Sequence, residues 1–244
     1  QDGTFAGEKT AGNNSDTNGY GNFFSAVPSG YSAICTGALT VASEVDPAQT
    51  DDNYPQKLFG STIWTGDGTT SRAITGLGFQ LDWIWFKARS SAFSNRLYDT
   101  SRGINSNGCK RLFSNTDGAE TDQTSGQDIS AVGSDGFTLG ASSNLYTNDT
   151  NSGGLHVAWT WRANGGTETT NNTGTQTSYT QTDPSGGFSI VRYAGTGSSM
   201  TVGHGLSVEP KLTIVKDRDA SANWIVYTKV IDGSLDYFFL NTTD

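Results

Sequence analysis

Acidic side chains between residues 117 and 122 are the groups of this chain best suited to acid–base chemistry. Some glucan-cleaving enzymes carry two Glu and one Asp at positions i, i+2 and i+5 of a strand, which spaces the carboxylates for a nucleophile and an acid. In the run Glu120-Thr-Asp122-Gln-Thr-Ser125, a serine stands where the second Glu would be. Double displacement by this arrangement would have no proton donor. The sequence therefore predicts that the chain is not an enzyme.

Loops rich in oxygen-bearing side chains suggest a second chemistry, the binding of calcium. Ca²⁺ takes six to eight oxygen ligands, and loops of this composition supply them. None of the acidic clusters has the spacing of a known calcium loop, and ordinary polar turns account for the same residues. Both interpretations stay open. The calcium candidates are Asp117, Glu120, Asp122 and Asp149.

The two histidines, His156 and His204, lie far apart in the sequence. His204 stands between Gly203 and Gly205, which is typical of a turn rather than of a catalytic base or a metal ligand. The sequence contains no G-x-S-x-G turn, no Cys/His pair with zinc spacing and no phosphate-binding glycine loop. Because these motifs are missing, the sequence does not predict a hydrolase triad, a zinc site or a nucleotide site.

Aromatic and cationic side chains in loop-rich regions suit the recognition of sugars. A flat ring with a polar tip stacks on a sugar face, while Asn, Asp and Ser bind its hydroxyl groups. Packing of the tyrosines over the ends of a sandwich, and ion pairs of the cations with Asp99 or Asp135, explain the same residues equally well. The ligand-binding candidates are Tyr98, Tyr146, Lys87 and Arg89.

The composition favours strands and turns as the elements that position these groups. Gly accounts for 31 of the 244 residues and charged residues for only 16%, and Gly, Asn, Asp and Ser are turn formers. Aromatic residues make up 11%, which supplies large buried areas and argues against disorder. We therefore expect an all-β protein with long loops.

The net charge of −9 and the pI of about 4.6 oppose binding to a phosphate backbone. Nucleic acid is therefore not an expected partner. No run of eighteen apolar residues occurs, so no membrane span is expected. The two cysteines, Cys35 and Cys109, are compatible with a single bridge or with two reduced, packed thiols.

Part of the sequence occurs twice, 129 positions apart. Residues 59–99 and 188–228 share eight identities in 41 positions without a gap, and after a slip of three residues 113–116 matches 239–242. We call these stretches the first copy and the second copy. The duplication predicts tandem modules. The expected segments are 1–52 as the end of a preceding domain, 53–166 as a β-sandwich, 167–187 as a polar linker or loop, and 188–244 as the truncated start of a second sandwich.

Alternation of side chains identifies the central strand of the predicted sandwich. A period of two in residues 82–89 places Trp83 and Trp85 on one face and Ile84 and Phe86 on the other. Both faces are apolar at this end, which predicts a strand covered on both sides. Short strands between polar turns predict an antiparallel β-sandwich or jelly roll. The expected core residues are Trp83, Trp85, Phe86, Trp159 and Trp161.

Several motifs of the chain are shared with a known kind of module. They are Gly76–Arg89, Tyr98–Gly103, Ser134–Gly140 and Val157–Ala163. They resemble a repeat module of large structural proteins of tailed bacteriophages, marine ones in particular. Residues 1–6 and 28–34 are similar to the closing strands of a SPRY-like domain. The resemblance implies a concanavalin-like sandwich in tandem modules, and it brings neither a ligand nor catalytic residues with it.

The resemblance also implies a role, that of a structural or adhesive module at the virion surface, in a tail fibre, a spike or a capsid fibre. The expected partners are other virion proteins, host-surface glycans and further copies of the chain in a homo-oligomer. Two alternatives remain: an extracellular polysaccharide-degrading enzyme, and a secreted bacterial adhesin or surface-layer protein. Release of oligosaccharides from a polysaccharide would favour the enzyme.

Overall fold

The computed structural model describes residues 12, 14–17, 19–21, 23–33, 54–105, 108–124, 128–140, 146–150, 154–183, 187–230, 232–234 and 236–243. The chain divides into two units, residues 1–52 and 53–244. In the first unit, Asn14 and Phe23 form an isolated antiparallel bridge, and the Asp16 carboxylate accepts hydrogen bonds from the amides of Tyr20 and Ala33. That this unit closes a SPRY-like domain stays a prediction.

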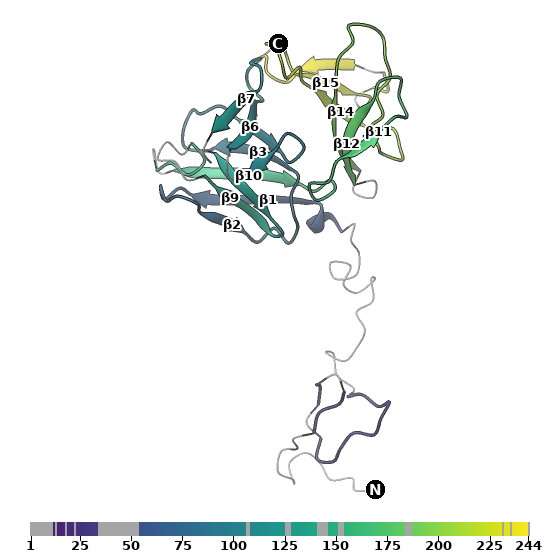
Figure 1. Cartoon of the computed structure of the whole chain (residues 1–244). Helices are drawn as coiled ribbons and strands as arrows, with labels where there is room; N and C mark the ends of the chain where they lie inside the picture. Colours follow the sequence, from purple (N-terminus) through teal and green to yellow (C-terminus); the bar gives the residue numbers. More distant parts are fainter. Residues whose placement is uncertain are drawn as a thin grey trace. The chain divides into compact units, whose positions relative to one another are not determined.

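The first part of the second unit is a sandwich of two antiparallel sheets, which we call the first sandwich (Figure 1). The larger sheet has the order β1-β10-β3-β4-β6-β5, with β7 paired to β6, and the smaller one has the order β2-β9-β8. A short 3-10 helix, η2 (Pro55–Lys57), precedes β1. The strands are β1 (Phe59–Thr65), β2 (Ala73–Thr75), β3 (Trp83–Ala88), β4 (Arg96–Asp99), β5 (Ile104–Asn105), β6 (Gly108–Phe113), β7 (Thr121–Thr124), β8 (Ile129–Gly133), β9 (Gly136–Leu139) and β10 (Leu155–Trp161).

The core of the first sandwich lies between its two sheets. On β3 the period of two buries Ile84 and Phe86 completely on the face toward β2-β9-β8, which we call the inner face. Trp64 of β1 packs edge-on against Phe137 of β9, with 5.8 Å between the ring centroids. Burial of each such side chain stabilises the fold by roughly 1.5–3 kcal/mol. The predicted all-β sandwich is thus confirmed, whereas its concanavalin-like type stays a prediction.

The opposite, outer face of the larger sheet is apolar as well. Trp83 and Trp85 pack there against a cluster of Leu97, Leu112 and Trp224. Strand β3 lies between β10 and β4 and is covered on both faces, as the alternation predicted. Of the five expected core residues only Phe86 is fully buried; the four tryptophans are partly exposed on the outer face. The most buried tryptophans of the described residues are instead Trp64 (8% exposed) and Trp224 (5%).

Cys109 is a free thiol on β6, buried in the core of the first sandwich. Burial raises the pKa of this thiol to about 11, so it is protonated and unreactive at neutral pH. Cys35 lies outside the described residues. In the part of the chain that the structure describes, no helix is long and apolar enough to cross a membrane.

The remaining strands form two three-stranded antiparallel sheets, β11-β12-β13 and β14-β15-β16. Residues 167–187, expected to be a polar linker or loop, contain β11 and β12. Polar side chains line β12, where the Ser178 hydroxyl donates to the Gly203 carbonyl, so a search for apolar alternation does not detect this strand. The bounds are β11 (Thr169–Asn171), β12 (Ser178–Asp183), β13 (Phe188–Tyr193), β14 (Leu212–Val215), β15 (Ile225–Thr228) and β16 (Asp236–Phe239).

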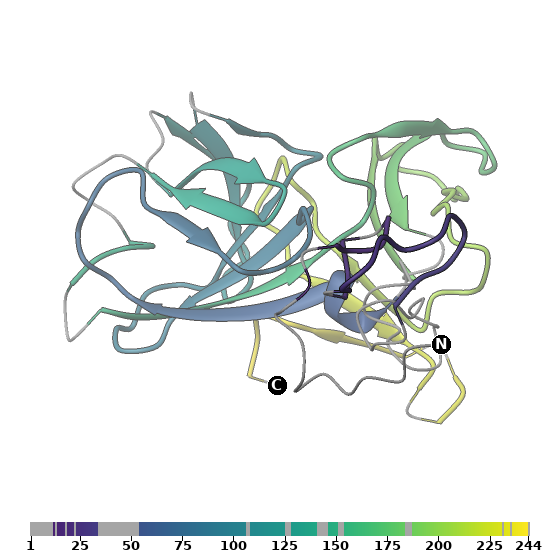
Figure 2. The same cartoon turned by 90° about the horizontal axis from the view of Figure 1, so that it is seen from below.

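The strands of the second copy pair with one another in the same register as the corresponding strands of the first copy. On β3 and β4, Trp83 lies opposite Asp99, and at the same offset Leu212 lies opposite Thr228 on β14 and β15. The pair Arg96 and Phe113 of β4 and β6 recurs, with the three-residue slip, as Ile225 and Phe239 of β15 and β16. Strands β14, β15 and β16 therefore correspond to β3, β4 and β6. Figure 2 shows these later strands, green to yellow, with the blue-to-teal strands of the first sandwich.

Candidate functional site

Glu120, a candidate both for catalysis and for calcium, lies in a network of cations. Its carboxylate accepts two hydrogen bonds from Arg218, at 2.7 and 2.9 Å, and one from Arg102 at 3.1 Å. Lys110 lies 3.5 Å away. The Glu120 side chain is only 9% exposed. Three cations surround one carboxylate, so this group is held as a structural ion pair rather than presented to a ligand.

The same contacts fix the protonation of Glu120. Burial by itself raises the pKa of this carboxyl, but hydrogen bonds from Arg218 and the charge of Arg102 lower it below its ordinary value. Glu120 is therefore ionised at neutral pH. An ionised, buried carboxylate without access to a substrate cannot act as the proton donor of a glycosidase.

The other calcium candidates have separate surroundings. Asp122 forms an exposed ion pair with Lys110 at 2.9 Å, and the Asp117 backbone carbonyl accepts the amide of Ala222. Asp149 lies beside the buried His156, whose Nε2 is 3.2 Å from the Asp149 carbonyl oxygen. Among the residues that the structure describes, no three Asp, Glu, His or Cys side chains are grouped closely enough to hold a metal ion.

The four ligand-binding candidates fall into different environments. Tyr98 is fully buried in the core of the first sandwich, so its ring has no face to offer a sugar. Tyr146 is 43% exposed and covers the Arg96 guanidinium at 4.5 Å. The Phe93 ring lies edge-on to Tyr146, and its carbonyl accepts a hydrogen bond from Lys87. Arg89 is exposed. The structure thus connects Lys87 with Tyr146 through Phe93.

The two aspartates considered as partners for Lys87 and Arg89 are engaged elsewhere. Asp99 binds Arg102 at 2.5 Å. Asp135 accepts the amides of Gly78 and Gly76, and these bonds lower the pKa of its carboxyl. Arg218, which repeats Arg89 at the offset of 129 positions, forms an ion pair with Glu120 instead.

The second copy packs on the outer face of the first sandwich, and we call this contact the junction. Trp224 is buried against Leu97 and Leu112, and its indole N–H donates to the Phe113 carbonyl at 2.8 Å. The Phe188 ring stacks on Trp161 with 6.1 Å between centroids. Together with the Glu120–Arg218 pair, these contacts resemble a protein interior more than a hinge between flexibly linked domains.

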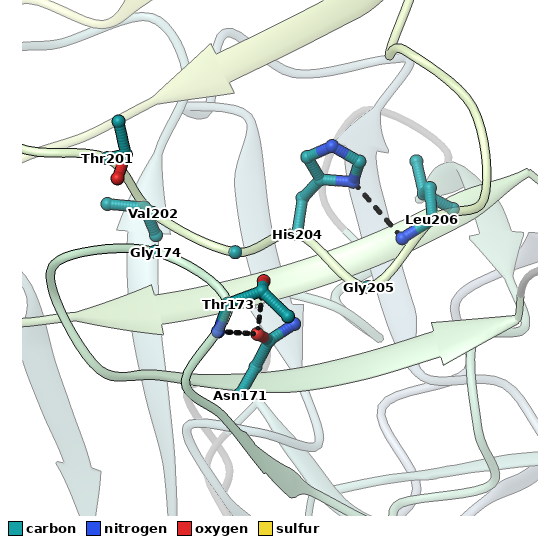
Figure 3. Close-up of a pocket in the computed structure, with 9 residues that line it drawn as sticks. Asn171, Thr173, Gly174, Thr201, Val202, His204, Gly205 and Leu206 are labelled. Carbon is teal, nitrogen blue, oxygen red and sulfur yellow. Dashed lines mark hydrogen bonds between the residues drawn. The ribbon is translucent and has the colours of Figure 1, made fainter.

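A pocket of about 460 Å³ opens beside β11 and β12 in the second unit (Figure 3). Two loops line it, one following β11 and the other at residues 201–206. Its side chains are mainly polar and its glycines expose backbone groups. The lining residues are Asn171, Thr173, Gly174, Thr201, Val202, Gly203, His204, Gly205 and Leu206.

Hydrogen bonds within the loops hold the pocket in shape. The Asn171 side-chain oxygen accepts the amide and the hydroxyl of Thr173, which makes a local turn. The Nδ1 atom of His204 accepts the amide of Leu206 at 3.1 Å, consistent with the turn predicted for this histidine. Since Nδ1 is an acceptor, the neutral ring carries its proton on Nε2, which remains a donor. The pocket therefore offers hydroxyl, amide, imidazole and backbone groups.

Sequence reasoning missed this pocket because the lining residues of its two loops are at least 27 positions apart, from Gly174 to Thr201, and one loop lies in the segment expected to be a linker. The Asn171 and Thr173 pair is a common turn motif. No motif in the sequence connects this turn with His204. The pocket therefore could not be predicted from the sequence.

Comparison with known proteins identifies the family of this chain. Neither the curated proteins nor the solved structures yield a match. A family model described as a domain of unknown function, DUF7483, matches residues 54–244 in one stretch. The match includes the first sandwich, β11 and β12, and the second copy. The chain therefore belongs to the DUF7483 family.

Proposed function

We propose that this chain is a non-enzymatic structural and adhesive module of a bacteriophage virion appendage, such as a tail fibre, a spike or a capsid fibre. The observation that supports this most is the junction, where Trp224 and the Glu120–Arg218 pair fix the second copy to the first sandwich. Modules that contact their neighbours through packed, apolar surfaces keep a fixed relative orientation, unlike modules joined only by a linker. The resemblance to phage repeat modules, with their concanavalin-like sandwiches, supports a position of such modules at the virion surface.

The adhesive part of the proposal rests on the pocket beside β11 and β12. Thr173, Thr201 and His204 present small polar groups around a concave, solvent-accessible volume, which matches the many hydroxyl groups of a glycan. The Nε2–H of His204 is a donor for a sugar oxygen. We therefore assign host-surface glycans as the ligand class.

A glycan array with the full chain tests this assignment. In the variant His204→Asn, the side-chain oxygen can replace Nδ1 as acceptor for the Leu206 amide, while the Nε2–H donor is lost. We expect His204→Asn to weaken glycan binding about tenfold, the effect of losing one good hydrogen bond. Tyr146→Ala is the matched control on the first sandwich and should bind normally. Loss of binding in Tyr146→Ala alone would move the site to that ring.

Immunogold labelling with an antibody against this chain tests the virion location. Gold on the appendages of phage particles is the expected result, whereas gold confined to bacterial envelopes would support the adhesin alternative.

Incubation of the chain with bacterial and algal polysaccharides tests the remaining alternative, an extracellular polysaccharide-degrading enzyme. Release of oligosaccharides that is lost in Glu120→Gln would replace our proposal with an enzyme.

A further inference from the structure

A buried group of three polar side chains joins the first sandwich to the sheet β11-β12-β13. Asp82 directly precedes β3, Thr100 directly follows β4, and Gln181 lies on β12. Asp82 and Gln181 are completely buried, and Thr100 is partly buried. We call these three residues the Asp82 cluster. It brings a carboxylate, a hydroxyl group and a side-chain amide together at a place to which water has little access.

The Thr100 hydroxyl is in position to attack the Gln181 amide. The two heteroatoms of that amide lie 2.9 and 3.2 Å from the Thr100 Oγ1 atom. The amide carbon is bonded to both heteroatoms, so it lies in contact with the same oxygen. Holding two reacting atoms about 3–3.5 Å apart replaces a collision between free groups by a reaction within one molecule. The geometry therefore favours bond formation between Oγ1 and the amide carbon.

Asp82 is placed to accept the proton of that hydroxyl. The Thr100 Oγ1 atom donates to Asp82 Oδ1 at 2.8 Å. The two carboxylate oxygens also accept four backbone amides, from residues 163–166, at 2.6 to 2.9 Å. These bonds fix the carboxylate relative to the hydroxyl, and a general base must lie within hydrogen-bond reach of the proton that it removes.

The neighbours of the Gln181 amide determine which of its heteroatoms is the nitrogen. One heteroatom lies 3.1 Å from Asp82 Oδ1, an acceptor, and the other lies 3.0 Å from the Ser101 backbone amide, a donor. Assigned from these hydrogen bonds, the nitrogen faces Asp82 and the oxygen faces Ser101. The Ser101 N–H thus points at the oxygen that would become negatively charged during attack, and Asp82 lies beside the nitrogen that would leave.

We propose that Thr100 and Gln181 form an ester bond within the folded chain. Asp82 takes the hydroxyl proton while Oγ1 bonds to the amide carbon, and the Ser101 N–H stabilises the resulting oxyanion. The C–N bond then breaks, and the nitrogen takes the proton from Asp82 and leaves as ammonia. An ester replaces the amide, nothing is oxidised or reduced, and each chain reacts once without a separate substrate.

The ester ties the sheet β11-β12-β13 covalently to the first sandwich. It closes a loop between residues 81 positions apart, and a cross-link between distant residues restricts the unfolded chain. The site belongs to the first copy alone, because at the offset of 129 positions Lys211 and Lys229 replace Asp82 and Thr100. One such bond per chain is therefore expected. This cross-link does not depend on the pocket or on glycan binding.

Tryptic mapping of the full chain by mass spectrometry tests the proposal. Cleavage after arginine releases residues 97–102, with Thr100, and residues 163–192, with Gln181. We expect these two segments as a single linked peptide, lighter than their sum by about 17 Da, the mass of the lost ammonia. Mild alkaline hydrolysis should separate them and leave a glutamate in place of Gln181.

Two variants and an internal control define the nucleophile. Thr100→Val removes the hydroxyl and should give two separate peptides, whereas Thr100→Ser keeps a hydroxyl and should restore the linked peptide. The internal control is the exposed pair Thr177 and Asn172, whose hydroxyl and amide oxygen are also 2.9 Å apart. Both lie in residues 163–192, so this peptide should keep its full mass in Thr100→Val if burial and Asp82 are required.

Two outcomes would overturn the proposal. The first is recovery of residues 97–102 and 163–192 as separate peptides of full mass from the folded, unmodified chain. The second is a linked peptide that persists in Thr100→Val, because the Ser101 hydroxyl of the same peptide would then be the nucleophile. Circular dichroism of each variant shows that the chains compared are folded.

Discussion

Glu120 is the residue on which cations from both parts of the second unit converge. Replacing it with Gln would leave Arg218 and Arg102 without their shared carboxylate at a nearly buried position. Because hydrogen bonds to charged groups contribute about 1.5–3 kcal/mol each, we expect Glu120→Gln to lower the free energy of unfolding by about 2–3 kcal/mol. Urea denaturation followed by tryptophan fluorescence measures this change.

Asp122 is the matched control, because it also pairs with Lys110 but is exposed. Exposed ion pairs contribute about 0–1 kcal/mol. Asp122→Asn should therefore change stability by less than about 1 kcal/mol. Equal losses in the two variants would contradict a special role for Glu120.

The pH dependence of stability provides a second test at the residue scale. The pKa of Glu120 is lower in the folded chain than its ordinary value of 4.5. The stabilisation it confers is therefore present above about that pH and is lost as the pH falls through the lower folded pKa. We expect the stability difference between the unmodified chain and Glu120→Gln to be constant from pH 7 to pH 5 and to shrink below pH 4. A difference that persists unchanged at pH 2 would contradict this assignment.

Among the elements, β1 and β3 bury their tryptophans to different extents. Trp64 of β1 points to the inner face, contacts Phe86, Phe137 and His156, and donates its indole N–H to the Thr147 carbonyl. Trp85 of β3 lies on the half-covered outer face. We expect Trp64→Ala to cost roughly 3–5 kcal/mol and Trp85→Ala clearly less, as measured by chemical denaturation. The reverse order would mean that the outer face carries the main core.

The alternation in residues 82–89 was sufficient to predict β3, its central place and its two covered faces. It was not sufficient to rank the tryptophans, because which face is inner depends on the distant β8 and β9. Trp64 shares its face of β1 with Gly60 and Thr62, so the alternation in Phe59–Thr65 gave no comparable signal. Strand β12 was missed for a related reason: its buried positions hold Ser178 and Thr180, which are satisfied by hydrogen bonds rather than by apolar contacts.

The pocket and the junction were less predictable than the strands, because their contacts join residues far apart in the chain. Glu120 and Arg218 are 98 positions apart, and no short sequence motif predicts that they form an ion pair. In the sequence, Arg218 repeats Arg89 at the offset of 129 positions, and Glu120 is a candidate for catalysis and for calcium binding. Only the packing of the second copy on the outer face brings the two together.

For the whole molecule, the junction determines whether the second copy and the first sandwich unfold as one cooperative unit. Trp224 is the tryptophan that the second copy contributes to it, and its replacement by Ala removes both its apolar contacts and its bond to the Phe113 carbonyl. Removal of a buried Trp costs about 3–5 kcal/mol. We expect Trp224→Ala to release β14, β15 and β16 while β3, β4 and β10 of the first sandwich stay folded.

Hydrogen–deuterium exchange resolves this by segment. Since about 1.4 kcal/mol corresponds to a tenfold change, a loss of 3 kcal/mol should speed amide exchange in β14–β16 roughly 100-fold in Trp224→Ala. Tyr237→Ala removes an exposed ring from β16 without touching the junction and should leave exchange in the first sandwich and in β14 nearly unchanged. If Trp224→Ala speeds exchange equally in β3 and β14, the unit unfolds as a whole, and docking of the second copy is then part of the fold of the first sandwich rather than a contact between separable modules.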